Sequence, residues 1–190
     1  MAEPPLVAVL AAGRATRFGG GKLEAACAGK PLGRWALDAV EEAGLAPGLI
    51  VAGPEGVSFA QGWTLVINPD PDAGLGASLA VAANSALSGG RTSLLVLLAD
   101  MPLVTPAYLR ELATGRAPVA TRYPDSRPGV PALLDRALLE RATNLTGDRG
   151  AGPLLVHAVM LEAPPGSLRD VDRPEDLAEV ERVLSSQLRE

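Results

Sequence analysis

Two cations are spaced along a glycine-rich segment near the N-terminus. Residues 10–22 read LAAGRATRFGGGK, with Arg17 and Lys22 separated by a run of glycines. Glycines let backbone N–H groups approach an anion closely, the arginine fork binds phosphate oxygens, and lysine supplies a point charge. The segment therefore predicts a triphosphate site. The alternative is a flexible surface loop without a ligand. That alternative does not explain why two spaced cations directly follow an apolar run.

The spacing of this segment excludes two common phosphate-binding motifs. A P-loop requires G-x-x-x-x-G-K-[ST], whereas Leu23 follows Lys22 and Thr16 occupies the place of the first glycine. The dinucleotide fingerprint G-x-G-x-x-G fails because Glu24 stands where its last glycine belongs. The sequence also lacks G-x-S-x-G, H-E-x-x-H and C-x-x-C, so we expect neither a hydrolase triad nor a structural zinc site.

Carboxylates that could hold a metal ion occur in two places. Asp100 directly follows the most apolar run, residues 94–98, and a carboxylate there can bind Mg²⁺ while phosphate oxygens and water fill the other positions. Asp172, just before the C-terminal helix, is the candidate for a second metal carboxylate. Both have simpler explanations: Asp100 can merely end a strand, and Asp172 with Glu175 suits a helix N-terminus.

Short apolar runs and helical periodicity alternate along the chain. The expected strands are residues 6–11, 49–52, 64–67, 94–98, 118–121 and 159–162. The expected helices are residues 34–42, 77–87, 133–142, 153–157 and 174–188, with another that starts at Pro106 after a Thr105 cap. Residues 13–30 are expected to form a long functional loop. The alternation predicts a doubly wound α/β sheet with 94–98 near its centre and ligands at the carboxyl ends of its strands.

Composition and charge narrow the class of protein. With 190 residues, 47% of them hydrophobic, the chain is expected to form a single α/β domain over residues 1–190. Its net charge of −5 provides no general attraction to nucleic acid, so local cations or a metal must hold an anionic substrate. The one cysteine, Cys27, is expected to be a small structural residue. Glu3 does not suit a signal peptide, and no apolar stretch approaches the roughly 18–20 residues of a membrane span, so we expect a cytoplasmic protein.

The order and spacing of several short motifs resemble those of the MobA-like NTP transferase family. The resemblance covers nearly the whole chain. Its motifs are LAAG-x-x-x-R-x-G-x-x-K at 10–22, GKPL at 29–32, Asn68 with GLGAS at 74–78, ADMP at 99–102, GDRGA at 147–151 and DVDRPEDL at 170–177. The chain is most similar to the molybdenum-cofactor cytidylyltransferase (MocA) type, since the sister guanylyltransferases typically carry glycine at the position of Ala12.

This resemblance implies a Rossmann-like, three-layer α/β/α nucleotidyltransferase fold, with a mostly parallel sheet and an antiparallel strand in the C-terminal part. It implies that an acceptor phosphate attacks the α-phosphorus of an NTP, with CTP favoured, and that pyrophosphate leaves. The implied acceptor is the molybdopterin cofactor, and the implied metal is Mg²⁺, with Mn²⁺ as an alternative. A molybdoenzyme or a chaperone would be a protein partner, whereas nucleic acid and membranes would not.

The resemblance also implies roles for individual residues. Those implied to be catalytic are Arg17, Lys22 and Asp100, and those implied to hold metal are Asp100 and Asp172. The implied nucleotide-binding residues are Leu10, Ala11, Ala12, Gly13, Arg14, Arg17, Lys22, Asn68, Gly74, Ser78 and Asp100.

Two departures from the family pattern keep other interpretations open. Val130 stands where the family has the histidine of G-H-P, and Gly152 stands where it has the last arginine of G-D-x-G-A-R. The acceptor could then be a sugar phosphate, an alditol phosphate or a phospholactate-like acid. A third interpretation is an accessory protein that binds nucleotide without turnover, and it is opposed by the retention of four residues: Arg17, Lys22, Asp100 and Asp172.

Overall fold

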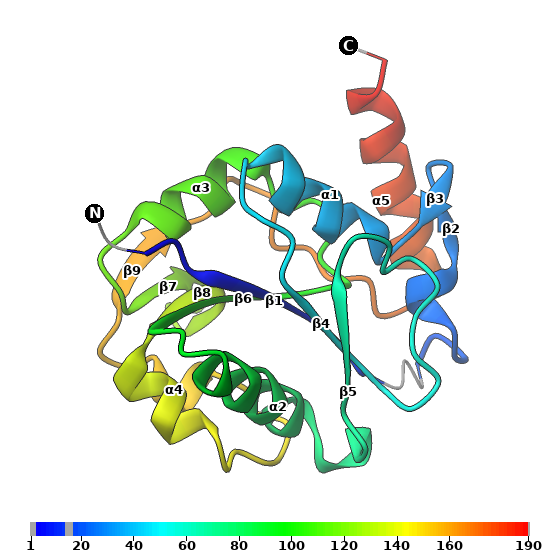
Figure 1. Cartoon of the computed structure of the whole chain (residues 1–190). Helices are drawn as coiled ribbons and strands as arrows, with labels where there is room; N and C mark the ends of the chain where they lie inside the picture. Colours follow the sequence, from blue (N-terminus) through cyan, green and yellow to red (C-terminus); the bar gives the residue numbers. More distant parts are fainter. Residues whose placement is uncertain (1–2, 14–16, 190) are drawn as a thin grey trace.

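A seven-stranded sheet lies between two layers of helices in this computed structural model, which describes residues 3–13 and 17–189 (Figure 1). Its strand order is β5-β4-β1-β6-β8-β7-β9. The strands are β1 (Leu6–Ala11), β4 (Leu49–Ala52), β5 (Thr64–Ile67), β6 (Ser93–Leu98), β7 (Val119–Arg122), β8 (Pro128–Asp135) and β9 (Val159–Glu162). The Rossmann-like, mostly parallel sheet that we expected is confirmed.

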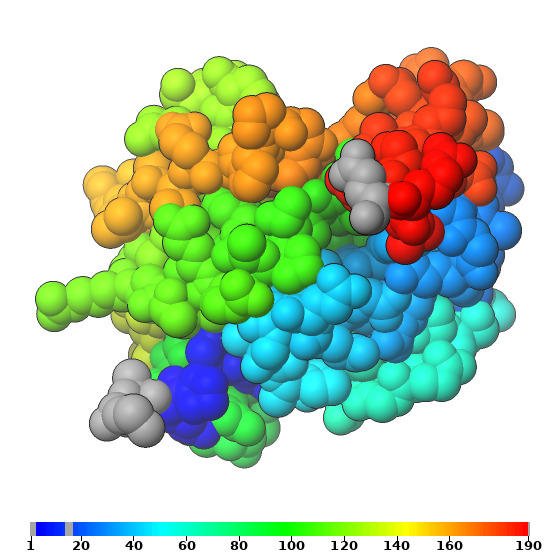
Figure 2. Space-filling model, turned by 90° about the horizontal axis from the view of Figure 1, so that it is seen from above, coloured from blue at the N-terminus to red at the C-terminus, as the bar shows by residue number. Residues whose placement is uncertain are grey.

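Helices cover both faces of this sheet. On one face lie α1 (Arg34–Glu42) and α3 (Pro106–Thr114), and on the other lie α2 (Leu75–Ser88) and α4 (Arg136–Ala142) (Figure 1). The last helix, α5 (Pro174–Gln187), instead packs against a small hairpin of β2 (Ala26–Cys27) and β3 (Lys30–Pro31). Figure 2 shows the red helix against this blue region. None of the helices in the part of the chain that is described is long and apolar enough to cross a membrane.

The central strands β1 and β6 bring their carboxyl ends to one edge of the sheet. They pair in parallel, with Leu10 opposite Leu98, and the Ala99 N–H donates to the Leu10 carbonyl at 3.0 Å. Residues 94–97 of β6 are completely buried because helices cover both faces of the sheet. A strand with two covered faces reads as a continuous apolar run. The prediction that this run is central is confirmed, and the segments after Ala11 and Leu98 become neighbours.

The helix expected over residues 133–142 is wrong in its first part. Residues 133–135 belong to β8, which pairs antiparallel with both β6 and β7. Leu133 and Leu134 point to opposite faces of the sheet and both are buried, so this strand lacks the alternation that would have identified it. The helix α4 starts only after Asp135, whose carboxylate accepts a hydrogen bond from the Leu138 N–H at 2.9 Å.

Three other expected segments differ in the structure by more than a one-residue shift of an end. The loop expected over residues 13–30 contains a 3₁₀ turn, Lys22–Glu24, and the β2–β3 hairpin. The helix expected at 77–87 begins earlier, at Leu75, and the helix expected at 153–157 is a 3₁₀ turn over Gly152–Leu154. These segments are short or rich in glycine, so tertiary packing decides their local structure more than periodicity does.

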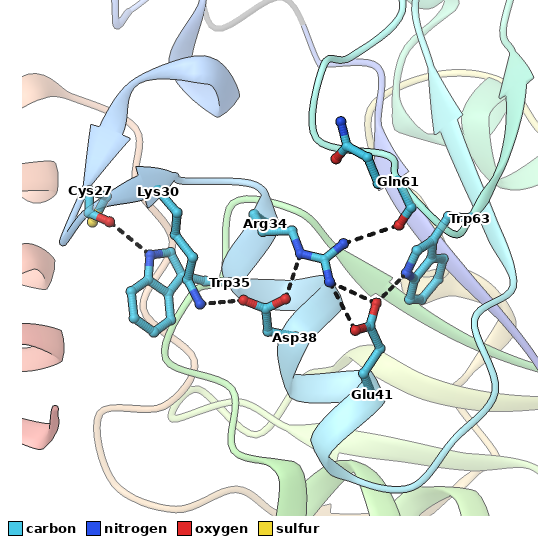
Figure 3. Close-up of polar contacts among 8 residues, drawn as sticks. All are labelled: Cys27, Lys30, Arg34, Trp35, Asp38, Glu41, Gln61 and Trp63. Carbon is cyan, nitrogen blue, oxygen red and sulfur yellow. Dashed lines mark hydrogen bonds and ion pairs between the residues drawn. The ribbon is translucent and has the colours of Figure 1, made fainter.

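A polar network along α1 connects the N-terminal hairpin to the segment before β5 (Figure 3). Arg34 donates to Asp38 at 2.5 Å and to Glu41 at 2.9 Å, and Glu41 also accepts from the Trp63 indole at 2.9 Å. At the other end, the Trp35 indole donates to the Cys27 carbonyl at 2.9 Å. The helix α1 therefore links the β2–β3 hairpin to the segment that leads into β5.

Candidate active site

Four of the predicted charged residues meet at the carboxyl ends of β1 and β6. The Lys22 ammonium donates to Asp100 Oδ2 at 2.7 Å and lies 3.4 Å from Asp172 Oδ1. Arg17 Nη1 lies 3.5 Å from the other Asp172 oxygen. Although Lys22 and Asp172 are 150 positions apart in the sequence, the fold brings them together beside Asp100. We call Lys22, Asp100 and Asp172 the charge cluster.

Backbone contacts hold the two carboxylates of the charge cluster side by side. Asp100 follows β6, and its carbonyl accepts a hydrogen bond from the Val171 N–H at 3.0 Å. Helix α5 is capped by Asp176, whose Oδ2 accepts from the Asp172 and Arg173 N–H groups at 3.1 and 2.8 Å. Helix capping therefore does not account for the Asp172 side chain, which instead faces Lys22 and Arg17.

Acidic groups at and beside the charge cluster are partly buried, and this affects their hydrogen bonds and their pKa values. Asp100 Oδ1 is fully buried and has no hydrogen-bond partner among the residues that the structure describes. Burial raises the pKa of the nearby Asp170 carboxyl, and the charges of Asp172 and Asp100 raise it further. Burial also raises the pKa of the Tyr123 hydroxyl to about 12, with Asp170 and Asp100 contributing, so this hydroxyl stays protonated. Asp170 is therefore a third carboxyl group close enough to Asp100 and Asp172 to feel their charges.

A first pocket, of about 430 Å³, opens beside Asp100. The predicted nucleotide-binding residues that line it are Leu10, Ala12, Gly13, Gly74, Ser78 and Asp100. Of the other lining residues, Leu75 and Asp148 belong to the GLGAS and GDRGA motifs, whereas Pro71, Asp72 and Leu98 lie outside the motifs. The two sides of this pocket come from the end of β1 and the start of α2.

A further pocket, of about 580 Å³, lies against the same segment after β1. It is lined by Ala11, Ala12, Gly13 and Lys22, and its other walls are residues 53–57 and 69–72. The wall at 53–57 was not predicted, although it follows β4 directly and the carboxyl-end rule would have found it. Glu24 accepts from the Ser58 N–H at 2.8 Å and so links the 3₁₀ turn Lys22–Glu24 to the residue that follows this wall.

Gly74 marks a close approach of two chain segments. The Gly147 N–H donates to the Ala73 carbonyl at 2.6 Å, and the Gly76 N–H donates to the Gly147 carbonyl at 2.8 Å. Gly74 has φ +87° and ψ −177°, and a Cβ placed there would lie 2.5 Å from the Gly147 carbonyl carbon. Only glycine fits this backbone at this separation. The GLGAS and GDRGA motifs therefore form one unit, which supports Asp148 at the first pocket.

Asn68 is a buried residue behind the surface of the first pocket, next to the lining residue Ser78. It is 2% exposed and is not among the residues that line the described pockets. Its Nδ2 donates to Ser78 Oγ at 3.1 Å, and its Oδ1 accepts from the Asp70 N–H at 3.1 Å. The side chain thus connects the loop after β5 to α2 behind the pocket surface.

We expect Asn68→Ala to lower the free energy of unfolding by about 1–3 kcal/mol, because it leaves Ser78 and the Asp70 N–H without their buried partner. Urea denaturation measures this loss. Asn144→Ala is the matched control, since Asn144 is exposed and its side chain contacts the adjacent Thr143. Equal stabilities of the two variants would contradict this role of Asn68.

Arg14 lies outside the described residues. Cys27 is completely buried, and burial raises the pKa of its thiol to about 11, with Glu181 contributing. A thiol with this pKa stays protonated at neutral pH and is a poor nucleophile, which agrees with a structural role for Cys27.

Comparisons with known proteins agree with this geometry. The family model of the MobA-like NTP transferase domain matches residues 7–162. The chain is 28% identical to the purine catabolism protein PucB of Bacillus subtilis, over 97% of this chain and 100% of that protein.

Three solved structures, of two proteins, share the fold. Rv0371c from Mycobacterium tuberculosis has a TM-score of 0.81 and 26% identity over 96% of this chain and 99% of that one. A crystal structure of Rv0371c in complex with manganese has a TM-score of 0.76 and 24% identity, over 95% and 99%. A nucleotidyl transferase from Methanothermobacter thermautotrophicus, Mth528, has a TM-score of 0.80 and 22% identity over 98% and 100%. With the family model covering most of the sequence, the chain belongs to the MobA-like NTP transferase domain family and is a nucleotidyltransferase.

Proposed function

We propose that the protein transfers CMP from CTP to the phosphate of a molybdopterin cofactor and releases pyrophosphate. The charge cluster beside the first pocket carries this proposal, because it places a cation and two carboxylates next to the end of β1. An oxygen of the acceptor phosphate forms a bond to the α-phosphorus, and the bond from that phosphorus to the bridging α–β oxygen breaks. The leaving pyrophosphate takes the bond's electron pair.

The nucleotide is proposed to lie along the segment Leu10–Gly13, which borders both the first pocket and the pocket of Lys22. Lys22 and Arg17 would bind the triphosphate and neutralise the charge that develops on pyrophosphate. Such a reaction depends on positioning and charge neutralisation more than on a protein nucleophile. The preference for CTP rests on the resemblance of this segment, with Ala12, to the cytidylyltransferase type.

Asp100 and Asp172 are the proposed ligands of Mg²⁺ or Mn²⁺. Carboxylate oxygens are the donors that these hard cations prefer, and the Asp100 and Asp172 carboxylates both lie against the Lys22 ammonium, at 2.7 and 3.4 Å. No group of three or more His, Cys, Asp or Glu side chains that could hold a metal occurs in the described ranges, so the rest of the ligand shell would come from phosphate oxygens and water. A bound ion would offset the triphosphate charge. Rv0371c, which shares the fold, was solved in complex with manganese, and this supports the proposal of a divalent metal.

The acceptor is proposed to occupy a third pocket, of about 690 Å³, which shares Leu75, Leu98 and Asp148 with the first. Val130 and Gly152, the two departures from the family pattern, both line this pocket. This placement is the observation that favours the second candidate, a sugar phosphate or another small phosphate as acceptor. Either acceptor would enter beside Asp148 and approach the nucleotide from the side of β8.

Pyrophosphate release tests the proposed substrates. CTP, GTP, ATP and UTP are each mixed with Mg²⁺ and with molybdopterin, a hexose phosphate or an alditol phosphate. We expect release with CTP and molybdopterin to exceed every other combination by about tenfold or more, since one polar base contact is worth that much. Fastest release with a sugar phosphate would favour the second candidate. No release with any pair would support an accessory protein without turnover.

A further inference from the structure

The Lys22 ammonium occupies the place between the two carboxylates where the proposed metal would bind. Its Nζ lies 2.7 Å from Asp100 Oδ2 and 3.4 Å from Asp172 Oδ1. The other Asp100 oxygen, Oδ1, is fully buried, without a hydrogen-bond partner in the described part of the chain. The oxygen of Asp100 that an incoming ion can reach is therefore the one that Lys22 already neutralises.

A divalent ion cannot share these oxygens with the ammonium at little cost. The Lys22 side chain is only 9% exposed and that of Asp100 is 22% exposed, so water screens charges weakly here. Like charges a few ångströms apart repel strongly in such surroundings. Metal binding to the pair therefore requires the ammonium to move away from Asp100.

A triphosphate would give the ammonium another place to bind. Lys22 begins the 3₁₀ turn and lines the pocket that also includes residues 11–13. Its four-carbon stem is flexible and carries three N–H donors, so the ammonium can move while the backbone stays in place. Phosphate oxygens held against residues 11–13 would compete with Asp100 for it.

We propose that Lys22 is a resident counter-ion that closes the Asp100–Asp172 pair to divalent metal until a nucleoside triphosphate draws the ammonium away. This inference rests on the proposed function for the identity of the metal ligands. It predicts weak metal binding without nucleotide and a strong mutual enhancement of metal and nucleotide binding, because the coupling between two ligands is reciprocal.

Titration with Mn²⁺ alone, followed by the electron paramagnetic resonance of the free ion, tests the proposal. Lys22→Met removes the ammonium, which leaves Asp100 without its cation and Asp172 with Arg17 alone, a state that a divalent ion relieves. We expect Lys22→Met and Lys22→Ala to bind Mn²⁺ about tenfold or more tightly than the original protein in the absence of nucleotide. We also expect CTP to strengthen Mn²⁺ binding about tenfold or more in the original protein, and less in Lys22→Met.

Lys30→Met is the matched control, because the sequence contains only two lysines and the net charge changes equally. Lys30 instead pairs with Asp38 and lies 3.4 Å from the centre of the Trp35 ring (Figure 3). The Mn²⁺ affinity of Lys30→Met should match that of the original protein.

If Lys22→Met binds Mn²⁺ no more tightly than Lys30→Met does, the inference is overturned. The proposed transferase function still stands in that case if CTP promotes Mn²⁺ binding. If Asp100→Asn binds Mn²⁺ with CTP as well as the original protein does, the proposed metal role of Asp100 fails, and the inference fails with it.

A measurement on the unmodified sequence covers the case in which the Lys22 variants fold poorly. Labelling lysine at ¹³Cε yields two side-chain signals, which Lys30→Met assigns. We expect Mg²⁺ with CTP to shift the Lys22 signal and to leave that of Lys30 in place, and Mg²⁺ alone to shift neither. A Lys22 signal that stays unchanged when Mg²⁺ and CTP bind would overturn the inference.

Discussion

Asp100→Asn is expected to reduce turnover by about a thousandfold or more, which is the size of effect seen when a charged group that supports phosphoryl transfer is lost. The amide keeps the size of the side chain but removes the charge that faces Lys22 at 2.7 Å and that would hold the metal. We expect a loss of about 1–3 kcal/mol in the free energy of unfolding, because a partly buried ion pair is broken. Steady-state pyrophosphate release and urea denaturation measure the two effects.

Glu140→Gln is the control for this substitution. Glu140 is an exposed carboxylate on α4 that pairs with Arg136 at 2.9 Å and does not belong to the charge cluster. We expect that variant to keep the original turnover and to lose well under about 1 kcal/mol of stability. If Asp100→Asn retains turnover comparable to Glu140→Gln, the account of the charge cluster as the reaction centre is wrong.

Gly74→Ala is expected to destabilise the protein by roughly 3 kcal/mol and to weaken nucleotide binding by about tenfold or more. The backbone at φ +87° and ψ −177° is strained for alanine, and the added Cβ would lie 2.5 Å from the Gly147 carbonyl carbon. The 74–76 and 147–148 segments would have to separate, and this would displace Asp148 from the first pocket. Calorimetric titration with Mg²⁺ and CTP, together with thermal unfolding, measures both effects.

Gly90→Ala is the control for Gly74→Ala, because it introduces backbone strain without a steric clash. Gly90 also has a positive φ, +73°, but a Cβ placed there would meet no atom within 4 Å. We expect it to cost about 1–2 kcal/mol and to leave nucleotide affinity unchanged. Equal behaviour of Gly74→Ala and Gly90→Ala would show that the contact between the two motifs does not support the pocket.

The sequence predicted the central part of the fold well for a simple physical reason. Residues 94–98 form a continuous apolar run, and such a run is typical of a parallel strand covered on both faces. A second rule, that ligands bind at the carboxyl ends of parallel strands, placed Lys22 and Asp100 at one sheet edge, since the carboxyl ends of β1 and β6 coincide. The side-chain contacts among Lys22, Asp100 and Asp172 depend on the path of residues 170–172, which no local pattern revealed.

Other parts could not be predicted, because the decisive interactions are tertiary. Two adjacent leucines at 133 and 134 suit a buried helix and a doubly covered strand equally, and only the pairing of β8 with β6 distinguishes them. The pocket wall at residues 53–57 carries no motif and is recognised only by its position after β4. The requirement for glycine at 74 follows from its contact with residues 147–148, far away in the sequence.

The fate of the CTP α-phosphorus tests the central claim most directly. CTP labelled with ³²P at the α-position is incubated with the protein, Mg²⁺ and molybdopterin, and the products are separated. Nucleotidyl transfer at the charge cluster predicts that the label joins the acceptor, that one pyrophosphate appears for each labelled product, and that Asp100→Asn loses both. Label recovered in CDP, which would mean transfer of the γ-phosphoryl group, or in free CMP with no labelled acceptor, would contradict the account.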